Sequence, residues 1–198
     1  MLDRIEIEQK TGSESLSLNK NDMGIKLIDF WKWSVSDLVS NATRGRFAEF
    51  IVATALNVDL TRIRDEWSAY DLESPEGIKV EVKSSAYLQS WFQKELSGIY
   101  FNIKKTRKWN EKTGKYSETP SREADIYVFC LLNHKDKTTV EPLNLDQWEF
   151  FVLSTPEIDN CKYIDKSITL KTLQKLTKGV SYDNLRDTII KQYELYKK

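Results

Sequence analysis

Alternation of hydrophobic and polar residues predicts several β-strands in this chain. Residues 78–84 (IKVEVKS) and 98–105 (GIYFNIKK) show the period of two that is typical of a half-buried strand. Residues 124–134 (ADIYVFCLLNH) are almost continuously apolar, which indicates a central strand buried on both faces. We expect a further strand over residues 147–154 (QWEFFVLS) and one or two short strands over residues 61–72 (TRIRDEWSAYDL).

Helical spacing of apolar residues predicts the helices. Residues 27–58 are expected to be helical, and Phe47, Phe50 and Ile51 begin an apolar pattern with a helical repeat. A short helix is expected over residues 168–179 and a closing helix from residue 181. Residues 86–96 are expected to form a short helix or an extended connection. Ser74, Pro75, Glu76 and Gly77 form a turn signal between two predicted strands.

The order of these elements predicts an α/β fold in which a central mixed β-sheet is flanked by helices. Residues 1–24 are polar and are expected to form an N-terminal arm or a weak edge strand. Residues 25–198 are expected to form a single domain, with its core at about 40–155 and C-terminal helices at about 167–197.

Composition limits the classes of protein to which this chain can belong. The chain has 198 residues, of which 40% are hydrophobic and 30% charged, and no apolar run approaches the ~20 residues of a membrane helix. The N-terminus has no apolar core of a signal peptide, so we expect a cytoplasmic protein without a membrane partner. The single histidine, His134, excludes histidine-rich metal sites. Cys130 is expected to be a small buried hydrophobe rather than half of a disulfide.

Net charge excludes a uniformly basic nucleic-acid binder, because 30 basic residues balance 30 acidic ones. A local basic patch is still present in the polar loop over residues 104–122. Its first part holds six basic residues and one acid, Glu111, which gives a local charge of +5 (six minus one) around Trp109. This loop could hold a nucleic-acid strand through phosphates and base stacking, or it could be a solvated hairpin tip. The basic residues are Lys104, Lys105, Arg107, Lys108, Lys112 and Lys115.

The remaining tryptophans are expected to pack in the core or on a sheet face, since a tryptophan side chain is large and mostly apolar. They are Trp31, Trp33, Trp67, Trp91 and Trp148.

Asp71, Glu81 and Lys83 are the first candidate site residues. The turn after Asp71 folds the chain back, so Asp71 and Glu81 can lie side by side on one sheet face, and Lys83 points to the same side as Glu81. Two neighbouring carboxylates repel each other, and a hard divalent cation such as Mg²⁺ is a usual partner. Taken alone, Glu81 and Lys83 would instead be typical of an ordinary surface strand with solvated charges.

Glu49 is the only charged residue of the apolar segment 47–58. A lone carboxylate in a buried helix costs several kcal/mol unless it is paired or bound to a metal. Gly45 and Ala53 lie four residues away on the same helix face and would allow close approach to the sheet. The alternative is that Glu49 lies at the helix edge and pairs with Arg44 or Arg46.

Ser84, Ser85 and Gln89 place short polar groups directly after Lys83. They could hydrogen-bond a phosphate or a metal-bound water, or the serines could simply cap the next element.

These positions together resemble the PD-(D/E)xK nuclease superfamily, which has the restriction-endonuclease-like fold. Asp71 and Glu81 match its metal ligands, Lys83 its catalytic lysine, and Glu49 the first-helix acid of some members. Gln89 matches a glutamine found in some exonuclease-like members. The residue before Asp71 is Tyr70 rather than proline, which departs from the pattern. The resemblance covers roughly residues 40–155 and suggests a stand-alone bacterial family.

The resemblance implies hydrolysis of DNA phosphodiester bonds with Mg²⁺ or Mn²⁺, and RNA is not excluded as the substrate. A chain with one such site cuts one strand at a time, so duplex cleavage would need a homodimer or two successive nicks. The alternatives are an inactive nucleic-acid-binding module on the same fold, and a protein-interaction domain in which the charged residues form an ion-pair network.

Overall fold

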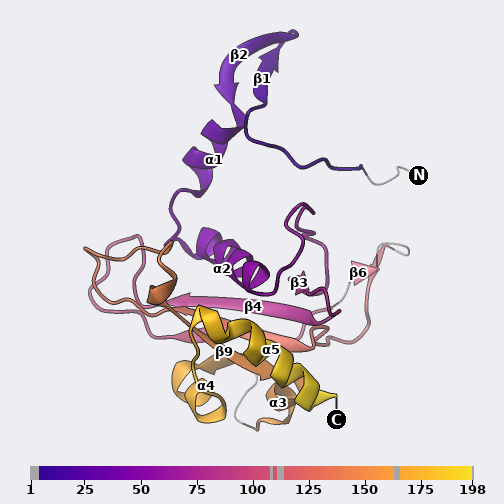
Figure 1. Ribbon diagram of the computed structural model, residues 1–198, viewed down its shortest axis with the longest axis vertical. Helices are drawn as coiled ribbons and strands as arrows, with labels where there is room; N and C mark the ends of the chain where they lie inside the picture. Colours follow the sequence, from indigo (N-terminus) through magenta and orange to yellow (C-terminus); the bar gives the residue numbers. More distant parts are fainter. Residues whose placement is uncertain (1–4, 108, 111–113, 163–165, 198) are drawn as a thin grey trace.

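A four-stranded mixed sheet forms the centre of the molecule in a computed structural model that describes residues 5–107, 109–110, 114–162 and 166–197 (Figure 1). The strand order is β3-β4-β8-β9, where β3 pairs antiparallel with β4, β4 parallel with β8, and β8 antiparallel with β9. The bounds are Leu72–Glu73 for β3, Lys79–Ala86 for β4, Ile126–Leu132 for β8 and Trp148–Ser154 for β9.

Strand β8 is the central strand that its continuous apolar sequence predicts, because all seven of its residues are buried. Side chains alternate between the two faces, so each sheet face has its own core. Val128 lies in one core and Phe129, which is 0% exposed, in the other. Cys130 is buried and carries no disulfide, as expected.

Two helices cover one face of the sheet, namely α2 (Asn41–Ala55) and α5 (Tyr182–Tyr196) (Figure 1). Ile51 and Val52 of α2 pack with Leu185 and Ile189 of α5 in the same core cluster as Val82 of β4. Strand β4 therefore has its valine side chains under α2, and its charged side chains point to the opposite face.

Shorter elements cover the opposite face of the sheet. They comprise the two-stranded sheet β5–β10 and two short helices, whose residues Phe101, Ile158, Ile168 and Leu173 join one core cluster. The bounds are Tyr100–Asn102 for β5, Thr155–Asn160 for α3, Ser167–Thr169 for β10 and Leu170–Leu176 for α4, and a 3-10 turn at Leu145–Gln147 precedes β9.

Two hairpins complete the fold. Strands β6 (Trp109–Asn110) and β7 (Lys115–Tyr116) pair within the polar loop after β5. At the N-terminal end, strands β1 (Ser15–Leu18) and β2 (Asn21–Lys26) form a hairpin that leads into α1 (Leu27–Val35). Figure 1 shows this hairpin and α1 projecting away from the sheet and its helices.

The α/β architecture with a mixed sheet flanked by helices is confirmed, and so are the strands β4, β8 and β9. The prediction of strands over residues 61–72 is wrong except at Leu72, because side chains shape this segment into turns. Asp59 accepts a hydrogen bond from the Thr61 amide, and Asp65 accepts one from the Trp67 amide. Ala86 ends β4, and residues 87–96 form a bent loop rather than a helix or an extended segment, because the Ser97 amide donates back to the Tyr87 carbonyl at 2.9 Å.

Burial of the tryptophans was predicted correctly for Trp148, which is 4% exposed, and wrongly for three others. Trp33, Trp67 and Trp91 are 84%, 65% and 53% exposed. Each lies in a loop or in the projecting helix, where no sheet face is available to cover it.

No helix in the described part of the chain is both long and apolar enough to span a membrane.

Candidate active site

Asp71 is positioned by the turn that follows it. Gly77 donates to the carbonyl of Ser74 at 2.9 Å and has a φ of +79°, a conformation that glycine adopts without strain, so the chain reverses as expected. The Asp71 amide then donates to the Val80 carbonyl at 3.1 Å, and its Oδ2 accepts from the Val82 amide at 2.8 Å. These two bonds hold the Asp71 carboxylate against the edge of β4.

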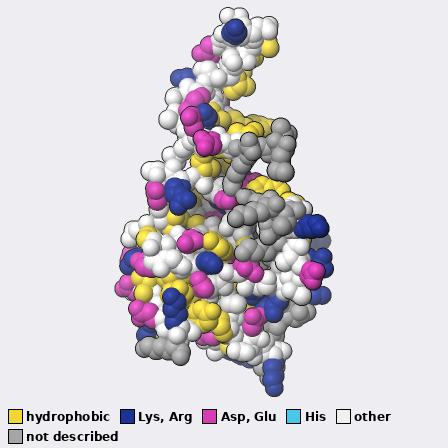
Figure 2. Space-filling model, turned by 90° about the vertical axis from the view of Figure 1, so that its right-hand side faces the viewer, with side chains coloured by type: hydrophobic (Ala, Val, Ile, Leu, Met, Phe, Trp, Pro, Cys, Tyr) yellow, Lys and Arg dark blue, Asp and Glu magenta, His cyan; other side chains and the backbone are white. Residues whose placement is uncertain are grey.

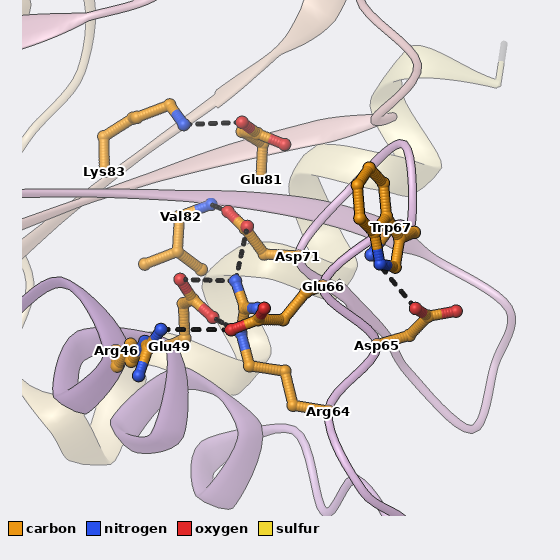
Figure 3. Close-up of polar contacts among 10 residues, drawn as sticks. All are labelled: Arg46, Glu49, Arg64, Asp65, Glu66, Trp67, Asp71, Glu81, Val82 and Lys83. Atoms are coloured by element: carbon orange, nitrogen blue, oxygen red, sulfur yellow. Dashed lines mark hydrogen bonds and ion pairs between the residues drawn. The ribbon is translucent and has the colours of Figure 1, made fainter. Parts of the chain in front are cut away.

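Glu81 and Lys83 lie on the face of β4 opposite α2, and their side chains form an ion pair with an Nζ–Oε1 distance of 2.5 Å (Figure 3). Their registered neighbours on β8 are Tyr127 and Phe129, so the apolar parts of the pair rest on an aromatic surface. The side chains are 21% and 27% exposed, which leaves both groups accessible to a ligand.

Glu49 comes from α2, on the other side of β4, and its carboxylate pairs with the guanidinium of Arg64. Arg64 Nη2 also donates to Glu49 Oε1 at 3.1 Å and lies 3.6 Å from Asp71 Oδ1. Arg64 therefore bridges Glu49 and Asp71. Arg44 and Arg46, the partners considered from the sequence, bond other groups instead, and Arg46 pairs with Glu66 at 3.0 Å.

The three carboxylates interact electrostatically. Burial raises the pKa of Glu81, the charge of Lys83 lowers it, and the charges of Asp71 and Glu49 raise it further. Burial also raises the pKa of Glu49, while the hydrogen bond from Arg64 opposes this effect. Buried, mutually repelling carboxylates are typical of cation-binding sites, because a bound cation stabilises their ionised forms against both burial and mutual repulsion.

Two clefts open beside Asp71. The larger, of about 880 Å³, lies between α2 and residues 57–75 and is lined by Glu49, Arg64 and Asp71. The smaller, of about 220 Å³, is lined by Asp71, Glu81 and Arg107 together with aromatic side chains. Asp71 thus belongs to both clefts and connects the Glu49 side of β4 with the Glu81 side. The aromatic residues of the smaller cleft are Trp67, Tyr70, Trp109 and Tyr116.

The donor atoms at this site are carboxylate oxygens, which are the protein ligands that Mg²⁺ and Mn²⁺ prefer. Within the described ranges, no three His, Cys, Asp or Glu side chains are gathered closely enough to hold a metal ion. Instead, Glu81 faces Lys83 and Glu49 faces Arg64. The chemistry of the donor set fits a hard divalent cation, while the side-chain arrangement is that of carboxylates paired with the cations of the protein itself.

Ser84 and Gln89 surround a buried arginine rather than Lys83. Arg44 is 3% exposed and donates to Ser84 Oγ at 3.1 Å and to Gln89 Oε1 at 3.4 Å. It also donates to the Val39 carbonyl and to Asn41 Oδ1, both at 2.7 Å. This network fixes the start of α2 against β4, so Ser84 and Gln89 support the site by placing its elements. Ser85 is half-buried, and alternation along β4 puts it on the same face as Lys83.

The basic loop reaches the site through Arg107, which lines the smaller cleft with Asp71 and Glu81. Trp109 packs edge-on against Tyr116 at a centroid distance of 4.9 Å, so the tip carries an aromatic pair beside the carboxylates. Lys105 lies 3.3 Å from Asp159, while Lys104 and Lys115 are exposed. Lys108 and Lys112 lie outside the described residues.

Arg64 is the site residue that the sequence did not reveal. It stands in a polar stretch that also contains Arg62, and no periodicity distinguishes the two arginines. Only the fold of residues 57–70 over α2 brings its guanidinium between Glu49 and Asp71. The signal available in the sequence was the unpaired Glu49 itself, which requires a cation from elsewhere in the chain.

Comparison with known proteins identifies the family. No curated protein matches the chain. A family model described as bacteriophage T4 endonuclease IV matches residues 14–172, which include all four candidate site residues. Because this match covers most of the 198 residues, the chain belongs to the bacteriophage T4 endonuclease IV family.

Proposed function

We propose that this protein is a metal-dependent nuclease that hydrolyses phosphodiester bonds in DNA. The observation that carries the proposal is the meeting of Asp71, Glu81 and Lys83 at one edge of β4, inside a chain that matches an endonuclease family. The mixed sheet and the position of Glu49 on the first covering helix also support a restriction-endonuclease-like core of the PD-(D/E)xK type.

Asp71 and Glu81 would hold Mg²⁺ or Mn²⁺, with Glu49 as a further ligand. The metal would supply a water of lowered pKa and a positive charge beside the scissile phosphate. Lys83 contacts Glu81 in the structure, so its ammonium would orient the attacking water and offset the negative charge that develops on the phosphate. Arg107 and the Trp109–Tyr116 pair would hold the neighbouring part of the strand.

Cleavage of labelled linear and circular DNA, with Mg²⁺, with Mn²⁺ and with a chelator, tests this proposal. We expect cleavage only with metal, and we expect Asp71→Ala, Glu81→Gln and Lys83→Ala each to lower the rate by at least about 10²-fold. Lys79→Ala is the matched control for Lys83, since it removes a lysine from the same face of the same strand. Glu73→Gln is the control for the acids.

Two results would contradict the proposal. If the three variants cleave as fast as the wild-type protein, the activity comes from elsewhere or from a contaminant. If titration calorimetry shows no Mg²⁺ or Mn²⁺ binding that depends on Asp71 and Glu81, the charged residues are an ion-pair network. RNA of the same sequence belongs in the assay, because its cleavage in place of DNA would change the substrate class and leave the site assignment intact.

A further inference from the structure

The N-terminal hairpin has apolar side chains that nothing in the described chain covers. Leu16 and Leu18 are two residues apart on β1 and therefore share a side of the hairpin, while Met23 lies on β2 where the register shifts between the pairs Ser17–Asp22 and Ser15–Lys26. Ile25 follows two residues after Met23. These four side chains are 45–61% exposed. Figure 2 shows hydrophobic side chains on the surface of this projecting part.

Helix α1 adds further uncovered apolar side chains to the projecting part of the molecule. It contains no buried residue, and its Phe30 and Trp33 are 52% and 84% exposed. The two rings lie 6.4 Å apart, so they form one aromatic patch. Trp31 points the other way, onto Gly12, where an added Cβ would lie only 2.8 Å from the indole ring. Helix and hairpin are thus joined into one unit, which we call the hairpin–helix unit (residues 11–36).

Such a unit is not expected to hold its shape alone in water. An isolated two-stranded hairpin is marginally stable at best, and a helix of nine residues is shorter than the ~12–15 residues at which isolated helices become marginal. An uncovered apolar surface of this size on a soluble protein marks an interaction site.

We propose that the hairpin–helix unit packs against the same unit of a second copy of this chain, forming a two-fold symmetric dimer. The exposed apolar area is large enough for such a dimer. A fully exposed large apolar side chain has about 200 Å² of surface. On this basis the eight exposed apolar residues from Leu16 to Val35 together expose roughly 800 Å². That is about the area that each partner contributes to a standard stable interface.

The net charge of the unit favours a second copy of this chain as its partner over a nucleic acid or another strongly charged molecule. The unit carries three basic and three acidic residues, so its net charge is zero and opposite charges are available on both copies. A two-fold interface uses the same patch twice and requires this kind of self-complementarity. The inference goes beyond the proposed function and does not depend on it, although a dimer would supply two candidate sites. The charged residues are Lys20, Lys26, Lys32, Glu14, Asp22 and Asp29.

Light scattering coupled to size exclusion, without DNA or metal, tests the dimer. We expect the wild-type chain to have twice the mass of one copy and F30E/W33E to have the mass of one copy. The matched control is F92E, which places a charge on a residue that is 85% exposed outside the unit and should leave the dimer intact. Urea unfolding of the part of the chain around the four-stranded sheet should have the same midpoint in the double variant and in the wild type, because no residue of α1 is buried.

Hydrogen exchange gives a second readout. Amides of β1, β2 and α1 should be protected at high protein concentration and should lose protection on dilution or in F30E/W33E. A wild-type chain that is monomeric at every concentration tested would overturn the proposal, whether or not another protein binds the unit. A dimer that survives F30E/W33E would also overturn it, because the interface would then lie elsewhere. Neither result decides whether Asp71, Glu81 and Lys83 cleave a DNA strand, so the two proposals fail separately.

Discussion

The carboxylate of Glu81 is accessible to a ligand, but its burial costs folding free energy when the group is ionised. Its carboxylate is largely buried on a sheet face, and burial outweighs the nearby ammonium of Lys83 in setting the pKa, which is raised. A raised pKa means that the folded chain holds a proton more tightly than the unfolded chain. The free energy of unfolding therefore falls as the pH rises from about 4.5, the ordinary value for Glu, through the raised value.

This sign gives a prediction for Glu81→Gln. At pH 4 the variant and the wild-type protein should be nearly equal in stability, since Glu81 is then mostly protonated in both states. At pH 7 to 8 the variant should be as stable as the wild type or more stable, by about 1 kcal/mol or less, because it no longer buries a negative charge. Denaturant unfolding at both pH values measures the difference. A variant that is less stable at pH 8 than at pH 4, relative to wild type, would show that the Lys83 pair outweighs burial.

Arg64 affects the ionisation of Glu49. Its hydrogen bond is the largest influence that lowers the pKa of Glu49, against burial and the charge of Asp71, which raise it. Arg64→Ala should therefore raise this pKa, so that a higher pH is needed before Glu49 is ionised. If Glu49 must be ionised for cleavage, the acidic limb of the pH–rate profile moves to higher pH.

Arg46→Ala is the control for this prediction, because Arg46 pairs with exposed Glu66 and leaves Glu49 untouched. An unchanged acidic limb in Arg64→Ala would mean that the ionisation of Glu49 does not limit the rate.

Glu49, Asp71, Glu81 and Lys83 could be selected from the sequence because strand alternation and a lone helical acid are local signals. Arg64 could not be selected, because its role depends on how a loop without periodicity lies over α2.

The contact between α2 and β4 depends on one buried cation. Arg44 donates to four neutral oxygens, from Val39, Asn41, Ser84 and Gln89, and burial lowers its pKa. It therefore joins the start of α2, the end of β4 and the connection after β4. Glu49 lies on α2 and Lys83 on β4, so this network determines how the two halves of the site meet.

Arg44→Met should lower the free energy of unfolding by about 2–4 kcal/mol, because it leaves buried acceptors without a donor while keeping most of the side-chain volume. Arg44→Lys should recover only part of the loss, since one ammonium cannot reach the same spread of acceptors. Urea unfolding of both variants tests this, with Arg46→Ala expected to change stability by no more than about 0.5 kcal/mol. A loss as small as that of the control would mean that water replaces the guanidinium easily.

The elements that the sequence predicted well are those with a single strong pattern. Strand β8 is apolar throughout, β4 alternates strictly, and the closing helix expected from residue 181 is α5, which begins at Tyr182. Residues 61–72 contain strand-forming residues, but the side chains of Asp59 and Asp65 accept hydrogen bonds from backbone amides and hold the segment in turns instead. The exposed tryptophans were misjudged because their hydrophobicity shows that they need a partner and does not show which surface supplies it.

The chain divides into a body around the four-stranded sheet and the projecting hairpin–helix unit. Among the described residues, the two cores and the side chains packed against them begin at Phe47. The family match covers residues 14–172, so it includes most of the unit and the body as far as α4. This arrangement predicts that the body folds without the unit. The hydrogen bond from Gln9 to the carbonyl of Leu60 is an exposed contact with the body and should contribute little.

A chain that begins at Asp37 should therefore unfold in one cooperative transition, with a free energy within about 1 kcal/mol of that of the body in the full chain. Asp37 must be kept, because it accepts hydrogen bonds from the amides of Val39 and Ser40 just before α2. Removing four more residues would take these amides and Ser40, the residue that precedes α2, and should destabilise the body. Urea unfolding of the two truncated chains distinguishes the cases. If the chain from Asp37 loses more than about 2 kcal/mol, the body depends on the unit, and a dimer formed through the unit would then be part of the fold itself.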